Sequence, residues 1–109
     1  FYQQALGLTV ARTIDAPTLC EVVMRRAGDE TGFCLVLFHH KDGREVSIGN
    51  GYGPIGIYTR DVGAAFRNAV SAGAVPQQQP FDVGKLRVAF VTDPEGHEIE
   101  FLSTTRLVR

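Results

Sequence analysis

Apolar and polar residues alternate along several short stretches of this chain, and a period of two residues is typical of half-buried β-strands. The pattern predicts strands at residues 8–14, 19–25, 33–38, 55–59, near Val75, 86–92 and 98–102. The stretch 33–38 is apolar on both faces, which predicts a central strand of its sheet. Most of the chain is therefore expected to form β-sheet.

Two stretches have a helical pattern instead. Asp61 is a suitable N-cap, and the apolar residues after it recur on one face of a helix that ends at Gly73: Val62, Phe66, Ala69 and Val70. Residues 1–6 have the pattern of the last turns of another helix, and Gly7 suits its C-terminal cap. The chain is thus predicted to have an α+β fold.

The order of these elements repeats once along the chain. Gly7 and Gly73 end equivalent helical segments, and residues 22–24 correspond to residues 88–90 at the same spacing. Elsewhere the spacing drifts slightly, and the drift falls in turns, where insertions are tolerated. Each repeat therefore predicts a β-α-β-β-β unit.

Length and composition limit the possible classes of function. A chain of 109 residues suits a single domain, with residues 1–45 as a first unit that lacks its opening strand and residues 54–103 as a second unit. The 11 basic and 12 acidic residues give a net charge of −1, so we expect neither nucleic acid nor a membrane as partner. Cys20 and Cys34 are too few for a disulfide scaffold, which favours reduced thiols in a cytoplasmic protein.

The candidate chemistry is concentrated in residues 87–101. Residues 93–96, Asp-Pro-Glu-Gly, predict a tight turn between two strands. Alternation divides the strand after this turn into two faces, with His97, Ile99 and Phe101 on one and Glu98 and Glu100 on the other. The apolar face needs a core, so the carboxylates are expected to face solvent or a polar cleft.

Three segments carry a resemblance to a known family. They are Phe1-Tyr2 with Leu6-Gly7-Leu8, Gly53-Pro-Ile-Gly-Ile-Tyr-Thr-Arg-Asp-Val62, and Asp93-Pro-Glu-Gly-His-Glu-Ile-Glu100. Together they resemble the vicinal oxygen chelate superfamily, which includes bleomycin-resistance proteins, extradiol dioxygenases and, as the closest likeness, glyoxalase I. The resemblance implies two βαβββ modules that form a curled sheet with a cleft.

The resemblance also implies a divalent metal, such as Zn, Ni, Mn or Fe, held by residues from four strands. Val36 stands where the family usually has Glu, and Pro54 stands where it usually has His; Glu100 alone matches. Valine and proline have no side-chain donor atom, whereas a catalytic divalent ion needs about three protein ligands. We therefore expect no metal cofactor; the alternative is a metal site in which Glu100 is a ligand.

By the same resemblance, a small-molecule ligand would lie in a trough walled by Val36, Phe38, Pro54, Tyr58 and Phe90. The Tyr58 hydroxyl would be a polar anchor in this trough. Glu100 would act as a general base or receive a ligand hydroxyl or amine. Lys85 and Arg87 lie on the predicted loop 81–87, where family members close a lid, and they would meet a carboxylate or phosphate of the ligand.

Three functions follow as hypotheses, and whether the protein is an enzyme stays open. The first is a metal-independent binder of a small organic ligand, by analogy with the bleomycin-resistance proteins. The second is a lyase or isomerase similar to lactoylglutathione lyase, with Glu100 as its base or metal ligand. The third is an inactive assembly scaffold. The resemblance further implies a homodimer, because many members of the family build their cleft across two chains.

Overall fold

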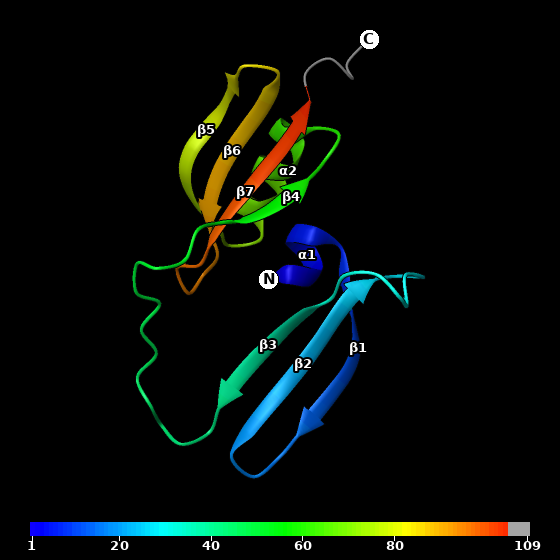
Figure 1. The fold of residues 1–109 in the computed structure, drawn as a ribbon, viewed down its shortest axis with the longest axis vertical. Helices are drawn as coiled ribbons and strands as arrows, with labels where there is room; N and C mark the ends of the chain where they lie inside the picture. The colour runs from blue at the N-terminus through cyan, green and yellow to red at the C-terminus, as the bar shows by residue number, and fades with distance from the viewer. Residues whose placement is uncertain (105–109) are drawn as a thin grey trace. The chain divides into compact units, whose positions relative to one another are not determined.

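The computed structural model describes residues 1–104 of the chain. Within them the elements are, in order, α1 (Tyr2–Leu6), β1 (Leu8–Asp15), β2 (Leu19–Arg26), β3 (Leu35–His40), β4 (Ile55–Tyr58), α2 (Val62–Ser71), β5 (Val75–Val83), β6 (Leu86–Thr92) and β7 (Glu98–Thr104) (Figure 1). The predicted α+β class is confirmed, and the order α-β-β-β occurs twice, as the repeat predicts. None of the helices in the described part of the chain is long and apolar enough to cross a membrane.

The chain divides into two compact units, which we describe one at a time. The C-terminal unit consists of Phe1, Gln3–Leu6 and the described residues from Ile48 onward. The N-terminal unit consists of Tyr2 and Gly7–Ser47.

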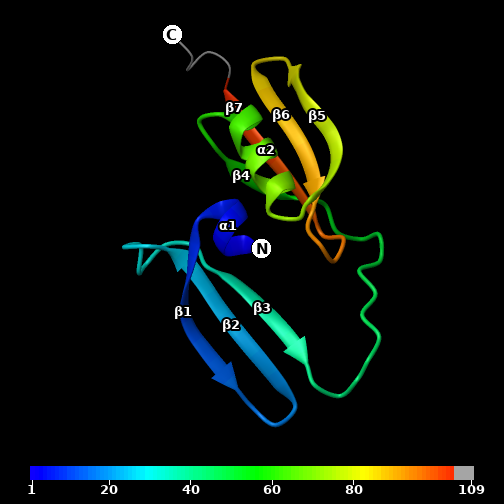
Figure 2. The same cartoon turned by 180° about the vertical axis from the view of Figure 1, so that it is seen from behind.

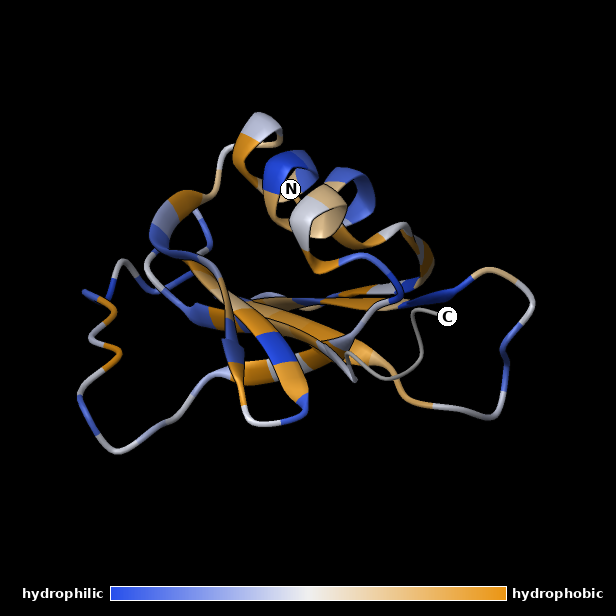
Figure 3. Ribbon diagram, turned by 90° about the horizontal axis from the view of Figure 1, so that it is seen from above, coloured by the Kyte–Doolittle hydropathy of each residue, from blue (hydrophilic) through white to orange (hydrophobic). Residues whose placement is uncertain are grey.

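The C-terminal unit is built on a four-stranded sheet with the order β4-β7-β6-β5. β4 runs parallel to β7, and the other neighbours are antiparallel. Helix α2 packs against one face of this sheet, and two views from opposite sides agree on this (Figures 1 and 2). The layer between them holds the core, which includes Phe66 of α2, Val91 of β6 and Phe101 of β7. The strands carry both apolar and polar segments, which suits a sheet with one buried face (Figure 3).

Helix α2 begins and ends as its sequence predicts. The Asp61 side chain accepts a hydrogen bond from the Ala64 backbone N–H at 3.0 Å, so Asp61 is the N-cap. Gly73 follows the helix with a φ of 114°, a conformation that favours glycine. Val62, Phe66 and Ala69 are buried, but Val70 is exposed. Val70 was wrongly assigned to the core face, because it lies at the margin of the apolar stripe.

The β5–β6 segment differs from its prediction. The expected short strand near Val75 is in fact nine residues long, and the expected loop 81–87 is a hairpin. Val83 pairs with Leu86, so the connection is the two residues Gly84 and Lys85. Gly84 has a φ of 58°, which allows the tight turn. Two register shifts in β5 interrupt its alternation, which explains why the sequence pattern ended early.

The N-terminal unit contains a three-stranded antiparallel sheet with the order β1-β2-β3. Among the described residues β3 pairs with β2 alone, so the prediction of a central strand for residues 33–38 is wrong. The counterpart of β3 in the C-terminal unit is β7, which has a parallel neighbour, β4, on its other side. The apolar residues of β3 are correspondingly open to solvent: Val36 is 38% exposed and Phe38 is 58% exposed.

Candidate functional site

The turn before β7 is fixed by one buried carboxylate. Asp93 is 5% exposed, and its Oδ1 accepts hydrogen bonds from the backbone N–H groups of Glu95 and His97, both at 2.9 Å. The Asp93 backbone N–H donates to the His97 carbonyl at 2.8 Å. Gly96 has a φ of 99°, as the predicted turn requires. This turn sets the pairing of β6 with β7 and therefore the position of Glu100.

His97 belongs to the turn rather than to the strand. β7 begins at Glu98, and the His97 Nδ1 lies 2.9 Å from the Asp93 Oδ2. His97 is therefore not part of the strand whose alternation grouped it with Ile99 and Phe101. Its ring is a partner of Asp93.

The two faces of β7 separate as the alternation predicts. Ile99, Phe101 and Ser103 are buried on the α2 side. Glu98, Glu100 and Leu102 are on the other side of the sheet, which we call the Glu100 face. By register this face also includes Gly56 and Tyr58 of β4, Phe90 of β6 and Phe81 of β5.

Glu100 is half-buried in the middle of this face. It pairs with Phe90 on one side and with Gly56 on the other. The Phe90 ring stacks with the ring of Phe81, with centroids 6.4 Å apart and an interplanar angle of 28°. Gly56 has no side chain, and the position that a Cβ would take there lies 3.6 Å from the Leu102 side chain. Glu100 is thus an acidic group between the Phe81–Phe90 ring pair and a glycine.

The other predicted ligand residues of the C-terminal unit have different positions. Tyr58 is on the Glu100 face and 69% exposed. Pro54 is exposed and directly precedes β4. Lys85 is in the β5–β6 turn. Arg87 pairs with Ser103, so it is on the side of β6 opposite Glu100, and it makes an ion pair with Asp82 at 3.1 Å.

Two predicted ligand residues, Val36 and Phe38, belong to β3 of the N-terminal unit. Val36 pairs with Val23, and Phe38 pairs with Glu21, so all four share one face of that sheet. The Phe38 ring makes an edge contact with His40, with centroids 6.2 Å apart. This face therefore has apolar side chains that are open to solvent.

Few side-chain donors are present at the positions where the resemblance expects metal ligands. Within residues 1–104, no three His, Cys, Asp or Glu side chains are grouped closely enough to hold an ion. Val36 and Pro54 offer no side-chain donor at the two positions where the resemblance expects one. Of the three positions compared with the family, Glu100 alone has a side-chain donor. A catalytic divalent ion takes about three protein ligands.

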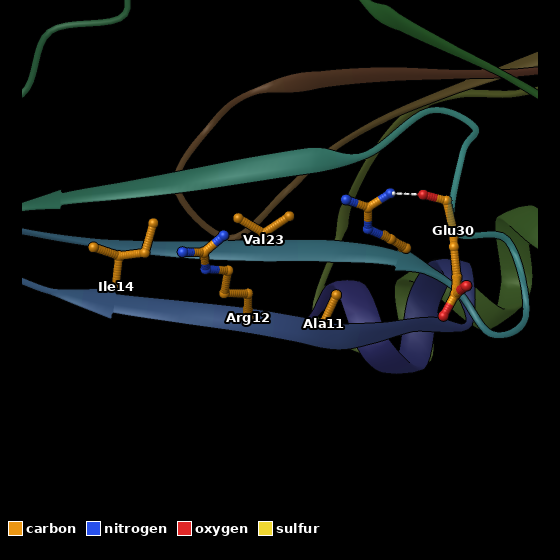
Figure 4. Close-up of a pocket in the computed structure, with 6 residues that line it drawn as sticks. Ala11, Arg12, Ile14, Val23 and Glu30 are labelled. Carbon is orange, nitrogen blue, oxygen red and sulfur yellow. Dashed lines mark hydrogen bonds between the residues drawn. The ribbon is translucent and has the colours of Figure 1, made fainter.

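Sequence reasoning missed one hollow in the N-terminal unit. It is lined by Ala11, Arg12, Ile14, Val23, Arg25 and Glu30 (Figure 4). The alternation of β1 does not predict it, because a register shift between Val10 and Arg12 interrupts the strand. The presence of two arginines on adjacent strands was the available signal.

The fold and the residues of β7 define the class of protein. Residues 1–101 match the family model of the Glyoxalase/Bleomycin resistance protein/Dioxygenase superfamily, and the chain belongs to that family. It is 36% identical to a lactoylglutathione lyase of Neisseria meningitidis, over 94% of this chain and 77% of the relative.

Solved structures show the same likeness. Glyoxalase I from Zea mays matches with a TM-score of 0.83 at 26% identity, over 93% of this chain. The chain spans 37% of the length of that maize protein. The trypanothione-dependent glyoxalase I of Leishmania major matches with a TM-score of 0.80 at 25% identity, over 98% of this chain and 76% of that one.

Proposed function

We propose that this protein binds a small organic ligand on the Glu100 face without using a metal ion. The observation that carries the proposal is the half-buried Glu100 carboxylate, which stands beside the Phe81–Phe90 ring pair while Val36 and Pro54 provide no metal donors. A site with apolar walls and a few polar groups is the usual form of a small-molecule site. Membership of a superfamily that includes bleomycin-resistance proteins agrees with binding as a function.

The chemistry of the Glu100 face favours a ligand with an aromatic or aliphatic body and an amine or hydroxyl. The apolar body would pack on Phe81 and Phe90, and the polar group would donate a hydrogen bond to Glu100. An amine would gain more than a hydroxyl, because a charge-assisted hydrogen bond is about twice as strong as a neutral one. The Tyr58 hydroxyl, on the same face, is a second polar group within this proposal.

A second candidate function is that of a lyase, and it rests on the sequence identity with lactoylglutathione lyases. In this candidate Glu100 takes a proton from the carbon acid of the substrate. Turnover of the hemithioacetal of methylglyoxal and glutathione, abolished in Glu100→Gln, would favour the lyase over the binder.

The binding proposal is tested with a matched pair of probes, 4-phenylbutylamine and 4-phenylbutanol, in the presence of EDTA. NMR titration of the full chain should shift the amide signals of Phe90, Glu100 and Leu102, and the amine should bind more tightly than the alcohol. Glu100→Gln should weaken amine binding about ten-fold, because one charge-assisted hydrogen bond is lost. Glu98→Gln is the matched control, because Glu98 is the exposed carboxylate of the same strand and face.

Two results would contradict the binding proposal. The first is an absence of shifts on the Glu100 face at the highest soluble probe concentration. The second is equal weakening by Glu98→Gln and Glu100→Gln, which would mean that the amine follows surface charge. If there is neither binding nor turnover, the scaffold hypothesis is favoured.

A further inference from the structure

The N-terminal unit has a hollow that the proposed function does not use. It is formed on one face of β1 and β2, together with Glu30, and its volume is about 330 Å³ (Figure 4). All of its lining residues belong to the N-terminal unit.

A β-bulge shapes the hollow. Val10 pairs with Met24 and Arg12 pairs with Val23, so Ala11 is the extra residue of β1. In a regular strand, consecutive residues point to opposite faces. The bulge lets both Ala11 and Arg12 line the same hollow. The small Ala11 side chain leaves the space beside Arg12 open.

The floor of the hollow is apolar. Ile14 of β1 and Val23 of β2 line it, and Ile14 is 39% exposed. Val23 pairs in turn with Val36, which extends the apolar surface toward β3. An apolar ligand body placed here would remove these side chains from water, which stabilises binding.

Two guanidinium groups make the hollow cationic. The Arg25 Nη1 donates a hydrogen bond to the Glu30 carbonyl at 2.6 Å, which holds that side chain at one end. Arg12 makes no hydrogen bond or ion pair with the described residues of the chain, and its guanidinium extends toward Val23 (Figure 4). The Glu30 carboxylate lies away from the Arg12 guanidinium (Figure 4). The lining residues thus include two cationic side chains and one anionic side chain.

We propose that this hollow binds a small amphiphilic carboxylic acid, with the carboxylate on the Arg12 guanidinium and the apolar body on Ile14 and Val23. Guanidinium presents two parallel N–H donors that match the two oxygens of a carboxylate. One guanidinium without a partner among residues 1–104 suits a monoanion, and the Glu30 carboxylate disfavours a more highly charged group. The hollow lies on the face of the N-terminal sheet that also carries Val36 and Phe38, and it goes beyond the function proposed for the Glu100 face, because it does not involve Glu100.

The test uses 4-phenylbutyrate and its neutral amide, 4-phenylbutanamide, which differ at the carboxylate alone. In an NMR titration of the full chain, 4-phenylbutyrate should shift the amide signals of Arg12, Ile14 and Val23. The neutral amide should bind about ten-fold more weakly, because the charged hydrogen bonds to Arg12 are lost. This comparison needs no protein variant.

Arg12→Met should produce the same loss of about ten-fold in affinity for 4-phenylbutyrate. Arg26→Met is the matched control: Arg26 is exposed, belongs to β2, and by alternation points away from the face of Arg25. The Arg26→Met chain should bind 4-phenylbutyrate as tightly as the unmodified chain does. Arg12→Lys keeps the charge without the planar donor pair and should give an intermediate affinity.

Several results would overturn the site. Equal affinity for the acid and the amide would show that the ligand's charge does not contribute to binding. An unchanged affinity for 4-phenylbutyrate in Arg12→Met would show that Arg12 does not contribute. Shifts confined to the C-terminal unit would place the acid elsewhere. Signals of Arg12 and Ile14 that move with protein concentration in the absence of probe would assign the face to a second copy of the chain. Failure of the Glu100 face would instead appear in the 4-phenylbutylamine titration.

Discussion

At the scale of single residues, Asp93 shows how a turn can position a candidate functional residue in the strand that follows. The turn that Asp93 stabilises directly precedes β7, which contains Glu100. The sequence predicts the turn, because Pro94 and Gly96 have the conformations that it needs. It does not predict that the Asp93 carboxylate is buried and bound to two backbone N–H groups. That role depends on neighbours that are brought together by folding.

We expect Asp93→Ala to lower the free energy of unfolding by about 1–2 kcal/mol, because the backbone N–H groups of Glu95 and His97 would lose their hydrogen bonds to this buried carboxylate. Asp93→Asn should recover part of this loss, since an amide oxygen can still accept from Glu95 and His97. Urea unfolding followed by circular dichroism measures both. An Asp93→Ala chain as stable as the unmodified one would show that water replaces the carboxylate without cost.

The residue scale also shows what sequence reasoning could reach at the candidate site. Alternation correctly separated Glu100 from Phe101, because a strand with one buried face leaves little choice. It could not reveal that Arg87 is on the other face of β6 from Glu100, because the sequence pattern predicts a loop at residues 81–87 where the structure has a hairpin. It missed Arg12 because a bulge hides the period.

At the scale of elements, the helix and the strands of the C-terminal unit depend on one another. Helix α2 buries Phe66 and Ala69 against the face of the sheet that includes Ile99 and Phe101. A ten-residue helix is marginal in isolation, so this packing supplies most of its stability. The Asn68 side chain adds a hydrogen bond to the Gln4 carbonyl at 2.8 Å, which ties α1 to α2.

Phe101→Ala should therefore destabilise the protein strongly. Loss of a fully buried phenylalanine costs about 3–5 kcal/mol, through lost burial and the cavity left behind. Phe33→Ala is the matched control, because Phe33 is 72% exposed, and its effect should stay within about 0.5 kcal/mol. Thermal unfolding of both variants measures the contrast. Equal melting temperatures would contradict the assignment of Phe101 to the core.

Strand boundaries were predictable where the alternation is uninterrupted. β6 was predicted at its observed bounds, and β4 and β7 within two residues at each end. β5 was not, because Pro76, Pro80 and the register shifts near Gln78 disrupt the period. The edge position of β3 could not be read from its apolar residues, since strand order depends on which neighbours are present.

At the scale of the whole molecule, we propose that the chain forms a homodimer, as its family resemblance implies. Among the described residues, one edge of β3 has no neighbouring strand, and a partner chain would cover it. A partner would also cover the exposed side chains of Val36 and Phe38. Sedimentation velocity at micromolar concentration should then show a species of twice the 11.9 kDa chain mass. A single species at the chain mass over the whole concentration range would contradict the dimer.

The central claim is the proposal of ligand binding without a metal. It rests on Val36 and Pro54, which have no side-chain donor and stand at two positions where the family resemblance implies metal ligands. It is tested most directly by elemental analysis of the purified chain after incubation with excess Zn, Ni, Mn and Fe ions and removal of the unbound ions. The account predicts well below one equivalent of any of these metals, with no difference between the unmodified chain and Glu100→Gln. About one equivalent of metal that is lost in Glu100→Gln would contradict it and would make the lyase the leading function.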